Sequence, residues 1–240
     1  MGNAWALLTS DGIILFDTLG TGEEAQKYII DGLTSLGLDP MTIKRIVVMH
    51  GHADHYGGAA YLQAMTGAPV YMSAVDWNFV AAEAAKGPQQ AERLNRIPTQ
   101  DRIIEDGEAL TLGDTSVRFI LTPGHTPGTL SAILPVVDQG ERHVAAYWGG
   151  AAIPSGLAGA QAYVASVNRF APAAGRAGVD AFLSNHPTND LTLLRLPVLA
   201  AREPEAAHPF VVGRRGAARM FDILRECARA AQVDAVEKKP

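Results

Sequence analysis

Four side chains that can bind a metal ion lie within six residues, directly after an apolar run that ends at Met49. They are His50, His52, Asp54 and His55, in a stretch that reads V-M-H-G-H-A-D-H-Y-G-G. Imidazole nitrogen and carboxylate oxygen bind zinc at about 2.0–2.2 Å, so donors at this density indicate a metal site. A chance cluster of histidines on a solvated loop is the alternative, and it leaves the further donors described below unexplained.

The spacing of these donors favours two sites rather than one. In an extended segment alternate side chains lie on the same side, so His50 and His52 would point together. Asp54 and His55 then begin a second set of donors. An open catalytic zinc takes three protein ligands, whereas a closed structural zinc takes four. We therefore expect the beginnings of two open sites side by side.

Two later motifs each supply one more histidine. One reads L-T-P-G-H-T-P-G and contains His125, and the other reads F-L-S-N-H-P and contains His186. Together with the H-x-H-x-D-H stretch, these motifs resemble the signature of the metallo-β-lactamase superfamily, and the resemblance covers nearly the whole chain. It implies an α/β (α+β) fold, the four-layer αββα sandwich, with a metal site at one edge of its two sheets.

The resemblance also implies two ligand sets, each of three side chains: His50, His52 and His125 for a first zinc ion, and Asp54, His55 and His186 for a second. A water shared between the ions would lose a proton near neutral pH and attack the substrate, because zinc lowers the pKa of bound water to about 7. The first ion would then polarise the substrate carbonyl, the second would stabilise the leaving atom, and Asp54 would orient the hydroxide.

One position departs from the pattern of many hydrolases in the superfamily. Those enzymes carry a bridging Asp in a G-D pair after the strand that precedes the last ligand. Here that strand ends in Y-W-G-G-A, and Gly150 stands where the Asp is expected. An Asp-His-His second site without the bridge is similar to the third subclass of metallo-β-lactamases. The serines with which that subclass holds a β-lactam carboxylate are replaced by Gly150, Ala151 and Ala152.

Three hypotheses for the function follow. The first is a dinuclear zinc hydrolase that resembles a β-lactamase, opens a cyclic amide in a small molecule and would confer antibiotic resistance. The second is a lactonase or other ester metallo-hydrolase, which the missing serines favour and the glycine at position 150 disfavours. The third is a non-catalytic metal-binding member, which the complete set of donors argues against.

Length, composition and charge limit the partners and the domain organisation. With 240 residues, 48% of them hydrophobic, residues 1–240 can form a single domain with a sizeable core. The net charge of −5 argues against nucleic acid as a partner, and no apolar run is long enough to span a membrane. Superfamily members usually have strands before Trp5, so we expect a trimmed or naturally short N-terminus. The protein would be periplasmic if a leader has been removed, and cytoplasmic otherwise.

Hydrophobic periodicity predicts the elements that position these donors. Strands are expected at Trp5–Thr9, Ile13–Phe16, Thr42–Met49, Pro69–Met72, Ile103–Ile104, Glu108–Leu112, Ser116–Leu121, Thr129–Val136, Arg142–Trp148 and Ala181–Ser184. Helices are expected at Glu23–Leu36, Ala59–Thr66, Ser73–Ala85, Ala162–Gly175, Thr188–Leu199 and Gly213–Val233. The donors follow the ends of strands, as a site at one edge of a sandwich requires.

A few further residues carry weaker expectations. The polar segment Gln89–Gln100 is expected on the surface, where it could flank the site. Tyr147 and Trp148 are expected to be packed aromatic residues, and the single cysteine, Cys227, a small buried hydrophobic residue.

Overall fold

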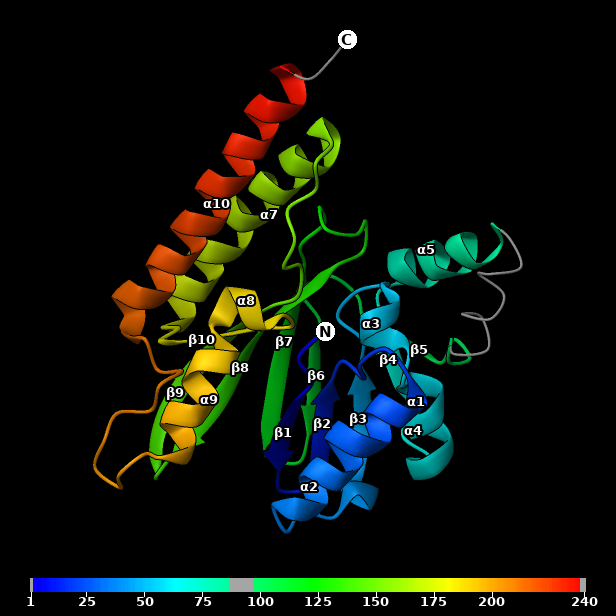
Figure 1. Ribbon diagram of the computed structural model, residues 1–240, viewed down its shortest axis with the longest axis vertical. Coiled ribbons are helices and arrows are strands. Elements are labelled where there is room, and N and C mark those ends of the chain that lie inside the picture. Colours follow the sequence, from blue (N-terminus) through cyan, green and yellow to red (C-terminus); the bar gives the residue numbers. More distant parts are fainter. Residues whose placement is uncertain (1, 87–96, 238–240) are drawn as a thin grey trace.

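Two five-stranded sheets form the centre of the protein in a computed structural model that describes residues 2–86 and 97–237 (Figure 1). The first sheet has the order β1-β2-β3-β4-β5, with β1 at Trp5–Thr9, β2 at Gly12–Phe16, β3 at Ile43–Val47, β4 at Val70–Met72 and β5 at Arg102–Ile103. The pair β1–β2 is antiparallel and the other neighbours are parallel.

The second sheet has the order β10-β9-β8-β7-β6, with β6 at Ala109–Leu112, β7 at Thr115–Leu121, β8 at Leu130–Asp138, β9 at Glu141–Trp148 and β10 at Ala181–Ser184. Its strands pair antiparallel except for β9 and β10, which are parallel. Tight turns join β6 to β7 and β8 to β9, and the loop 122–129, which contains His125, joins β7 to β8. Strands β9 and β10 are joined through a long helix, as a parallel crossover requires.

Helices cover the outer faces of both sheets (Figure 1). The first sheet is covered by helices that follow its strands: α1 at Gly22–Glu24, the π-helical turn Ala25–Ile30, α2 at Asp31–Ser35, α4 at Ala59–Thr66 and α5 at Ala74–Ala84. The second is covered by α7 at Leu157–Ala177 and α10 at Gly213–Glu237. The short helix α3 spans Ala53–Tyr56, while α8 spans Pro187–Asp190 and α9 spans Thr192–Ala200.

Three hydrophobic clusters lie between these four layers, and the inner strands of both sheets contribute to two clusters each. In β2, Ile13 and Leu15 face the helices, whereas Ile14 and Phe16 face the other sheet. Because side chains alternate across a strand, a strand buried on both faces is a continuous apolar run. This accounts for the hydrophobic stretch that ends at Met49, directly before the candidate metal ligands. It also confirms the expected αββα sandwich.

Most expected helices and strands are present, with local differences. The helix expected at Thr188–Leu199 is interrupted at Leu191, which adopts a left-handed conformation with φ of 58° between α8 and α9.

The expectation for Cys227 was wrong, because its position on α10 places it on the exposed side of that helix. Of the expected surface segment Gln89–Gln100, residues 89–96 lie outside the described residues. Within the described residues, no helix is both long enough and apolar enough to cross a membrane.

Candidate metal centre

Six donors from three parts of the chain come together at the edge where β3, β7 and β10 end: His50, His52, Asp54, His55, His125 and His186. They form two groups of three, with His50, His52 and His125 in one group and Asp54, His55 and His186 in the other. Within each group the potential ligand atoms lie within 4.8 Å of one another. The grouping is the one that the sequence predicts, and the role of these side chains as ligands remains a prediction.

The first group consists of three imidazoles that face one another. His125 Nε2 lies 3.0 Å from His52 Nδ1 and 3.1 Å from His50 Nε2. The ring of His50 is completely buried, whereas His52 and His125 are partly exposed. The group therefore has a buried base and an open side.

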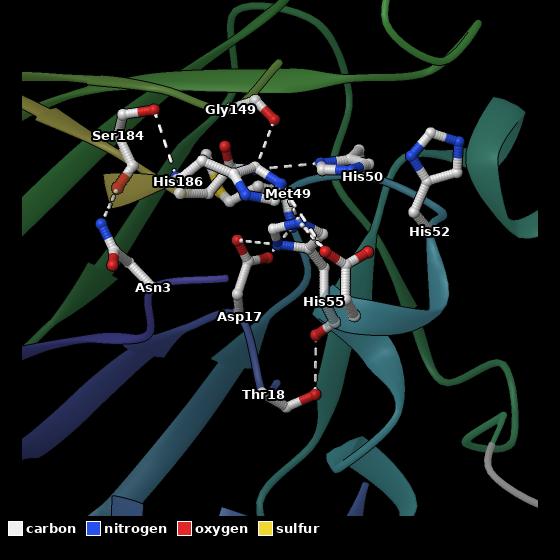
Figure 2. A network of polar contacts seen from close by, with 12 residues as sticks. Asn3, Asp17, Thr18, Met49, His50, His52, His55, Gly149, Ser184 and His186 are labelled. Atoms are coloured by element: carbon white, nitrogen blue, oxygen red, sulfur yellow. Dashed lines mark hydrogen bonds and ion pairs between the residues drawn. The ribbon is translucent and has the colours of Figure 1, made fainter. Parts of the chain in front are cut away.

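The second group adjoins the first, because the ring centroids of His50 and His55 are only 4.0 Å apart. His55 Nε2 lies 3.0 Å from His186 Nε2, and Asp54 Oδ2 lies 3.5 Å from the first of these atoms and 3.6 Å from the second. The carboxylate of Asp54 is 44% exposed, so this group is also open to solvent. Figure 2 shows His50, His55 and His186 converging above Asp17.

Close packing of the backbone holds the two loops that carry most of these donors. The carbonyl of His55 accepts hydrogen bonds from the backbone N–H and the hydroxyl of Thr18, at 2.8 and 2.7 Å. A Cβ atom on Gly57 would lie 1.9 Å from the carbonyl oxygen of Gly20, so only glycine fits there. Gly124, just before His125, has φ of +143° and packs against the Tyr163 backbone, which again requires glycine.

Asp17 is a buried carboxylate of the site that the sequence analysis did not identify. Its Oδ2 accepts a hydrogen bond from His55 Nδ1 at 2.9 Å and one from the Tyr147 hydroxyl at 3.1 Å, and its Oδ1 accepts from Met49 N–H at 2.7 Å (Figure 2). Because Asp17 binds Nδ1 of His55, the Nε2 atom points toward the second group. The available signal was an acid directly after the buried strand β2, which pairs in parallel with β3.

Asp76, at the start of α5, was also missed, and it joins the two loops of the first group. Its Oδ2 accepts hydrogen bonds from Gly51 N–H at 2.8 Å and the Thr126 hydroxyl at 2.6 Å. Its Oδ1 accepts from Gly128 N–H at 2.7 Å. Gly51 lies between the two histidines of the first loop, and Thr126 follows His125. The carboxylate therefore fixes the separation of the two loops.

Hydrogen bonds on the outer nitrogens orient His125 and His50. His125 Nδ1 lies 2.7 Å from the carbonyl oxygen of Ala152, which places its proton on Nδ1 and leaves Nε2 free. His50 Nδ1 lies 3.0 Å from Asn185 Nδ2. The loop that carries His186 is held by Asn3, whose backbone N–H donates to the Asn185 carbonyl at 2.7 Å and whose side chain donates to Ser184 O at 3.1 Å (Figure 2).

The electrostatics of the site suit neutral imidazole donors. Burial lowers the pKa of His50, His52 and His186, and it lowers the pKa of His125 to about 4. Burial also disfavours the charged form of His55, but the carboxylates of Asp17 and Asp54 outweigh it and raise the pKa of His55 to about 9.

The donors fit a metal ion in each group. Where the proton lies on Nδ1, as in His125, an Nε2 lone pair faces other nitrogens at about 3 Å. Lone pairs at that separation repel one another, and a cation bound between them converts the repulsion into attraction. Neutral imidazole with carboxylate is a donor set that zinc accepts, and three donors in each group leave a position for water or substrate.

The loop after β9 closes the site, and it contains Gly150, the position at which the sequence comparison expects a bridging Asp. A Cβ atom on Gly150 would lie 3.0 Å from His125 Cβ and 3.1 Å from Thr129 Cγ2, so a larger residue would require these neighbours to shift by a few tenths of an ångström. Tyr147 and Trp148 are completely buried, as expected, and the Trp148 indole N–H donates to the Gly150 carbonyl at 2.8 Å. The loop therefore presents backbone rather than an acidic side chain to the site.

The chain is similar to known proteins. The family model described as the metallo-beta-lactamase superfamily matches residues 1–136. A probable metallo-hydrolase of Bacillus subtilis, YqgX, is 28% identical over 137 residues, which are 57% of this chain and 62% of that protein. A hydroxyacylglutathione hydrolase of Maricaulis maris is 33% identical over 95 residues, 40% of this chain and 30% of that protein. The chain thus spans less than two thirds of the length of these curated relatives.

The similarity to solved structures extends over almost the whole chain. BJP-1, a subclass B3 metallo-beta-lactamase of Bradyrhizobium japonicum, superposes with a TM-score of 0.78 at 24% identity, covering 98% of this chain and 89% of that one. At this identity the likeness establishes the fold. Taken with the family model, which matches more than half of the chain, it leads to one conclusion: the protein belongs to the metallo-β-lactamase superfamily.

Proposed function

We propose that the protein is a dinuclear zinc hydrolase that resembles a β-lactamase and opens a cyclic amide in a small-molecule substrate. The observation that carries the proposal is the pair of adjoining three-donor groups, each open to solvent on one side. Structural zinc sites are closed by four ligands, whereas catalytic ones keep a position free. The two groups adjoin, because the ring centroids of His50 and His55 are 4.0 Å apart, and this proximity suits a single reaction centre.

The six donors would hold the ions, and the surrounding side chains would keep them in place. When bound, zinc would supply a water that is acidic near neutral pH and a Lewis acid for the carbonyl under attack. Asp54 would orient the attacking water, because its exposed carboxylate can accept a hydrogen bond from that water. Asp17 and Asp76 position the histidines without reaching the substrate.

The absence of an acidic side chain at position 150 supports a cyclic amide rather than an ester. Gly150 has no carboxylate and is closely flanked by His125 and Thr129, so the bridging Asp expected of the lactonase and thioesterase branches is missing. The solved structures that match 98% of the chain include metallo-beta-lactamases. These similarities favour a substrate with a strained amide.

An ester or thioester substrate is the second candidate. The Maricaulis maris relative is a hydroxyacylglutathione hydrolase, and Gly150, Ala151 and Ala152 provide no hydroxyl to hold a substrate carboxylate. A substrate without a carboxylate beside its scissile bond would not require those hydroxyls.

Hydrolysis of a chromogenic cephalosporin by the zinc-loaded protein tests the proposal, with a lactone and a thioester measured in parallel. We expect turnover of the cephalosporin that is lost with a chelator and restored by zinc. His186→Ala should reduce it by two or more orders of magnitude, because an ion held by two donors is bound weakly. His208→Ala is the matched control, because this histidine lies outside both groups.

The two candidates predict different results in the same assay. A protein shown to carry two zinc ions that turns over the lactone or thioester but not the cephalosporin would replace the first candidate with the second. A protein that carries two zinc ions and hydrolyses none of the three substrates would contradict both.

A further inference from the structure

A cavity of about 210 Å³ lies between the two sheets, away from the metal donors. Its walls come from β1 and β2 of the first sheet and from β8, β9 and β10 of the second, and α9 with residues 208–211 forms its roof. The lining is mostly apolar, with Leu134, Ala145 and Leu183 among the wall residues and Leu196 and Leu199 in the roof. A mostly apolar cavity of this size can accept an apolar ligand.

The inner end of the cavity is separated from the metal centre by a single layer of side chains. Phe16 and Tyr147 line the cavity and stack on each other, with ring centroids 5.4 Å apart. The hydroxyl of Tyr147 points away from the cavity and donates a hydrogen bond to Asp17. All hydrogen-bonding capacity at this end is therefore used, and a ligand would meet only the faces of aromatic and aliphatic side chains.

The outer end is polar and opens into a second space of about 250 Å³ that shares Asp138, His143 and His208 with the cavity. His143 Nδ1 lies 2.8 Å from Asp180 Oδ2, so it carries the proton and leaves Nε2 as an acceptor. His208 Nδ1 accepts a hydrogen bond from Phe210 N–H at 3.3 Å, so its Nε2–H is a donor. One acceptor and one donor at the mouth complement a hydroxyl group.

The charge around the mouth disfavours an anionic ligand. Arg202 donates to both carboxylate oxygens of Asp138, at 2.8 and 2.7 Å, so this pair is neutral overall. Glu141 and Glu205 also line the outer space, and the ion pairs found in the described part of the chain include neither of them. The mouth therefore has a net negative charge, which repels carboxylates.

The roof offers a path for entry. Only Thr192 of α9 is buried, while Leu193, Leu194 and Val198 are 72%, 68% and 59% exposed. Beyond α9 the roof is joined to the sheets by the edge-to-face contact of Trp5 with Phe210 and by a bridge between Ala181 and Val211. A helix with so little buried surface can move away without disrupting the hydrophobic clusters.

We propose that this cavity binds an uncharged amphiphile, an alkyl or arylalkyl chain of about six to nine carbons that ends in a hydroxyl. The chain length follows from the volume, because a cavity of about 150 Å³ accommodates benzene. The apolar chain contacts the Phe16 and Tyr147 rings, and the hydroxyl lies between His143 and His208. This site is independent of the hydrolytic reaction proposed above.

Calorimetric titration of the zinc-loaded full chain with 1-octanol tests the proposal, with octanoate as the anionic counterpart. We expect saturable binding of one octanol per chain and binding of octanoate that is weaker by about ten-fold or more. Val136→Phe fills the cavity from its wall and Leu196→Trp from its roof, and each should weaken octanol binding by about ten-fold or more. Leu193→Trp is the matched control, because it adds the same side chain on α9 outside the cavity.

The result does not depend on turnover, so it is separate from the test of the proposed function. Absence of saturable octanol binding to the folded protein would overturn the proposal, as would unchanged binding in a folded Leu196→Trp variant. Equal affinity for octanoate would overturn the assignment of an uncharged ligand. Circular dichroism establishes whether each variant folds, and if Val136→Phe does not, Leu196→Trp decides, because Leu196 is already 45% exposed.

Discussion

At the scale of single residues, the metal centre depends on carboxylates that do not face the substrate. Asp17 is completely buried and accepts hydrogen bonds from three groups: His55, Met49 N–H and Tyr147. Such partners of a ligand fix its tautomer and its orientation, and their loss typically lowers metal affinity by about 10–100-fold.

Substitution Asp17→Asn should therefore weaken the second metal group selectively. The amide keeps one acceptor, but it removes the negative charge beside His55 and cannot satisfy all three donors. We expect zinc content after dialysis to fall from about two ions per chain to about one. Asp11→Asn, in the exposed turn between β1 and β2, is the matched control. Two tightly retained zinc ions in the Asp17 variant would contradict this role.

Zinc binding should release a proton from His55 at neutral pH. In the metal-free protein the pKa of His55 is raised from 6.5 to about 9, so the side chain is an imidazolium at pH 7. The sign follows from linkage: this imidazolium stabilises the fold below pH 6.5, and that contribution is lost as the pH rises through about 9. Zinc requires the neutral ring, so affinity at the second group should increase with pH up to about 9.

Calorimetry in buffers that differ in ionisation enthalpy measures this proton. The heat of zinc binding at pH 7 should depend on the buffer, and the contribution of His55 to this dependence should fade as the pH rises through about 9, because His55 is then already neutral before zinc binds. A heat of binding that is the same in all buffers at pH 7 would show that His55 is neutral in the metal-free protein.

At the scale of elements, helix α5 couples two loops that are far apart in the sequence. Its N-cap Ser73 accepts a hydrogen bond from Asp76 N–H and donates to the Gly128 carbonyl, and the Asp76 carboxylate binds both loops of the first group. The first turn of one helix thereby sets the distance between His52 and His125.

Substitution Asp76→Ala should destabilise the protein by about 3 kcal/mol or more, because it leaves three buried donors without their acceptor at about 1–3 kcal/mol each. The first metal group should also bind zinc more weakly. Chemical denaturation and zinc titration measure the two effects. Asn78→Ala, at an exposed position of the same helix, should change neither quantity by more than about 0.5 kcal/mol. A similar stability for both variants would contradict the assigned role.

The junction between α8 and α9 contains a strained residue. Leu191 has φ of 58°, a conformation that costs an L-residue other than glycine about 1–2 kcal/mol. Leu191→Gly should therefore stabilise the protein by about 0.5 kcal/mol, after the greater flexibility of glycine in the unfolded chain is subtracted. Leu193→Gly, inside α9, should destabilise it by about 1 kcal/mol. Thermal denaturation measures both variants, and a stability change of the same sign in each would refute this interpretation.

At the scale of the whole molecule, we expect the fold not to depend on the metal ions. Three hydrophobic clusters join the four layers, and both ligand groups lie at one edge of the sheets. Ions at that edge stabilise the folded state by mass action, whereas the clusters provide the cooperative core.

Removal of the metal with a chelator should leave the far-ultraviolet circular dichroism unchanged and lower the midpoint of thermal unfolding. An ion present at a hundred times its dissociation constant contributes about 2.7 kcal/mol, which should be lost on chelation and regained with zinc. Unfolding of the protein on chelation at room temperature would show that the metal is required for folding.

The sequence by itself determined the donors and most of the elements that carry them. Short motifs place His50, His52, Asp54 and His55 after one strand, and continuous apolar runs mark strands that are buried on both faces. Both signals are local, because they depend on residues a few positions apart whose side-chain directions are set by the backbone.

Only the tertiary structure showed which acids support these donors. Asp17 reaches His55 from 38 positions away and Asp76 reaches Gly128 from 52, and such contacts depend on how sheets and helices pack. The left-handed Leu191 and the apolar cavity likewise arise where separate elements meet. Local periodicity contains no information about these contacts, because the free energy that fixes them is gained only when distant segments are buried together.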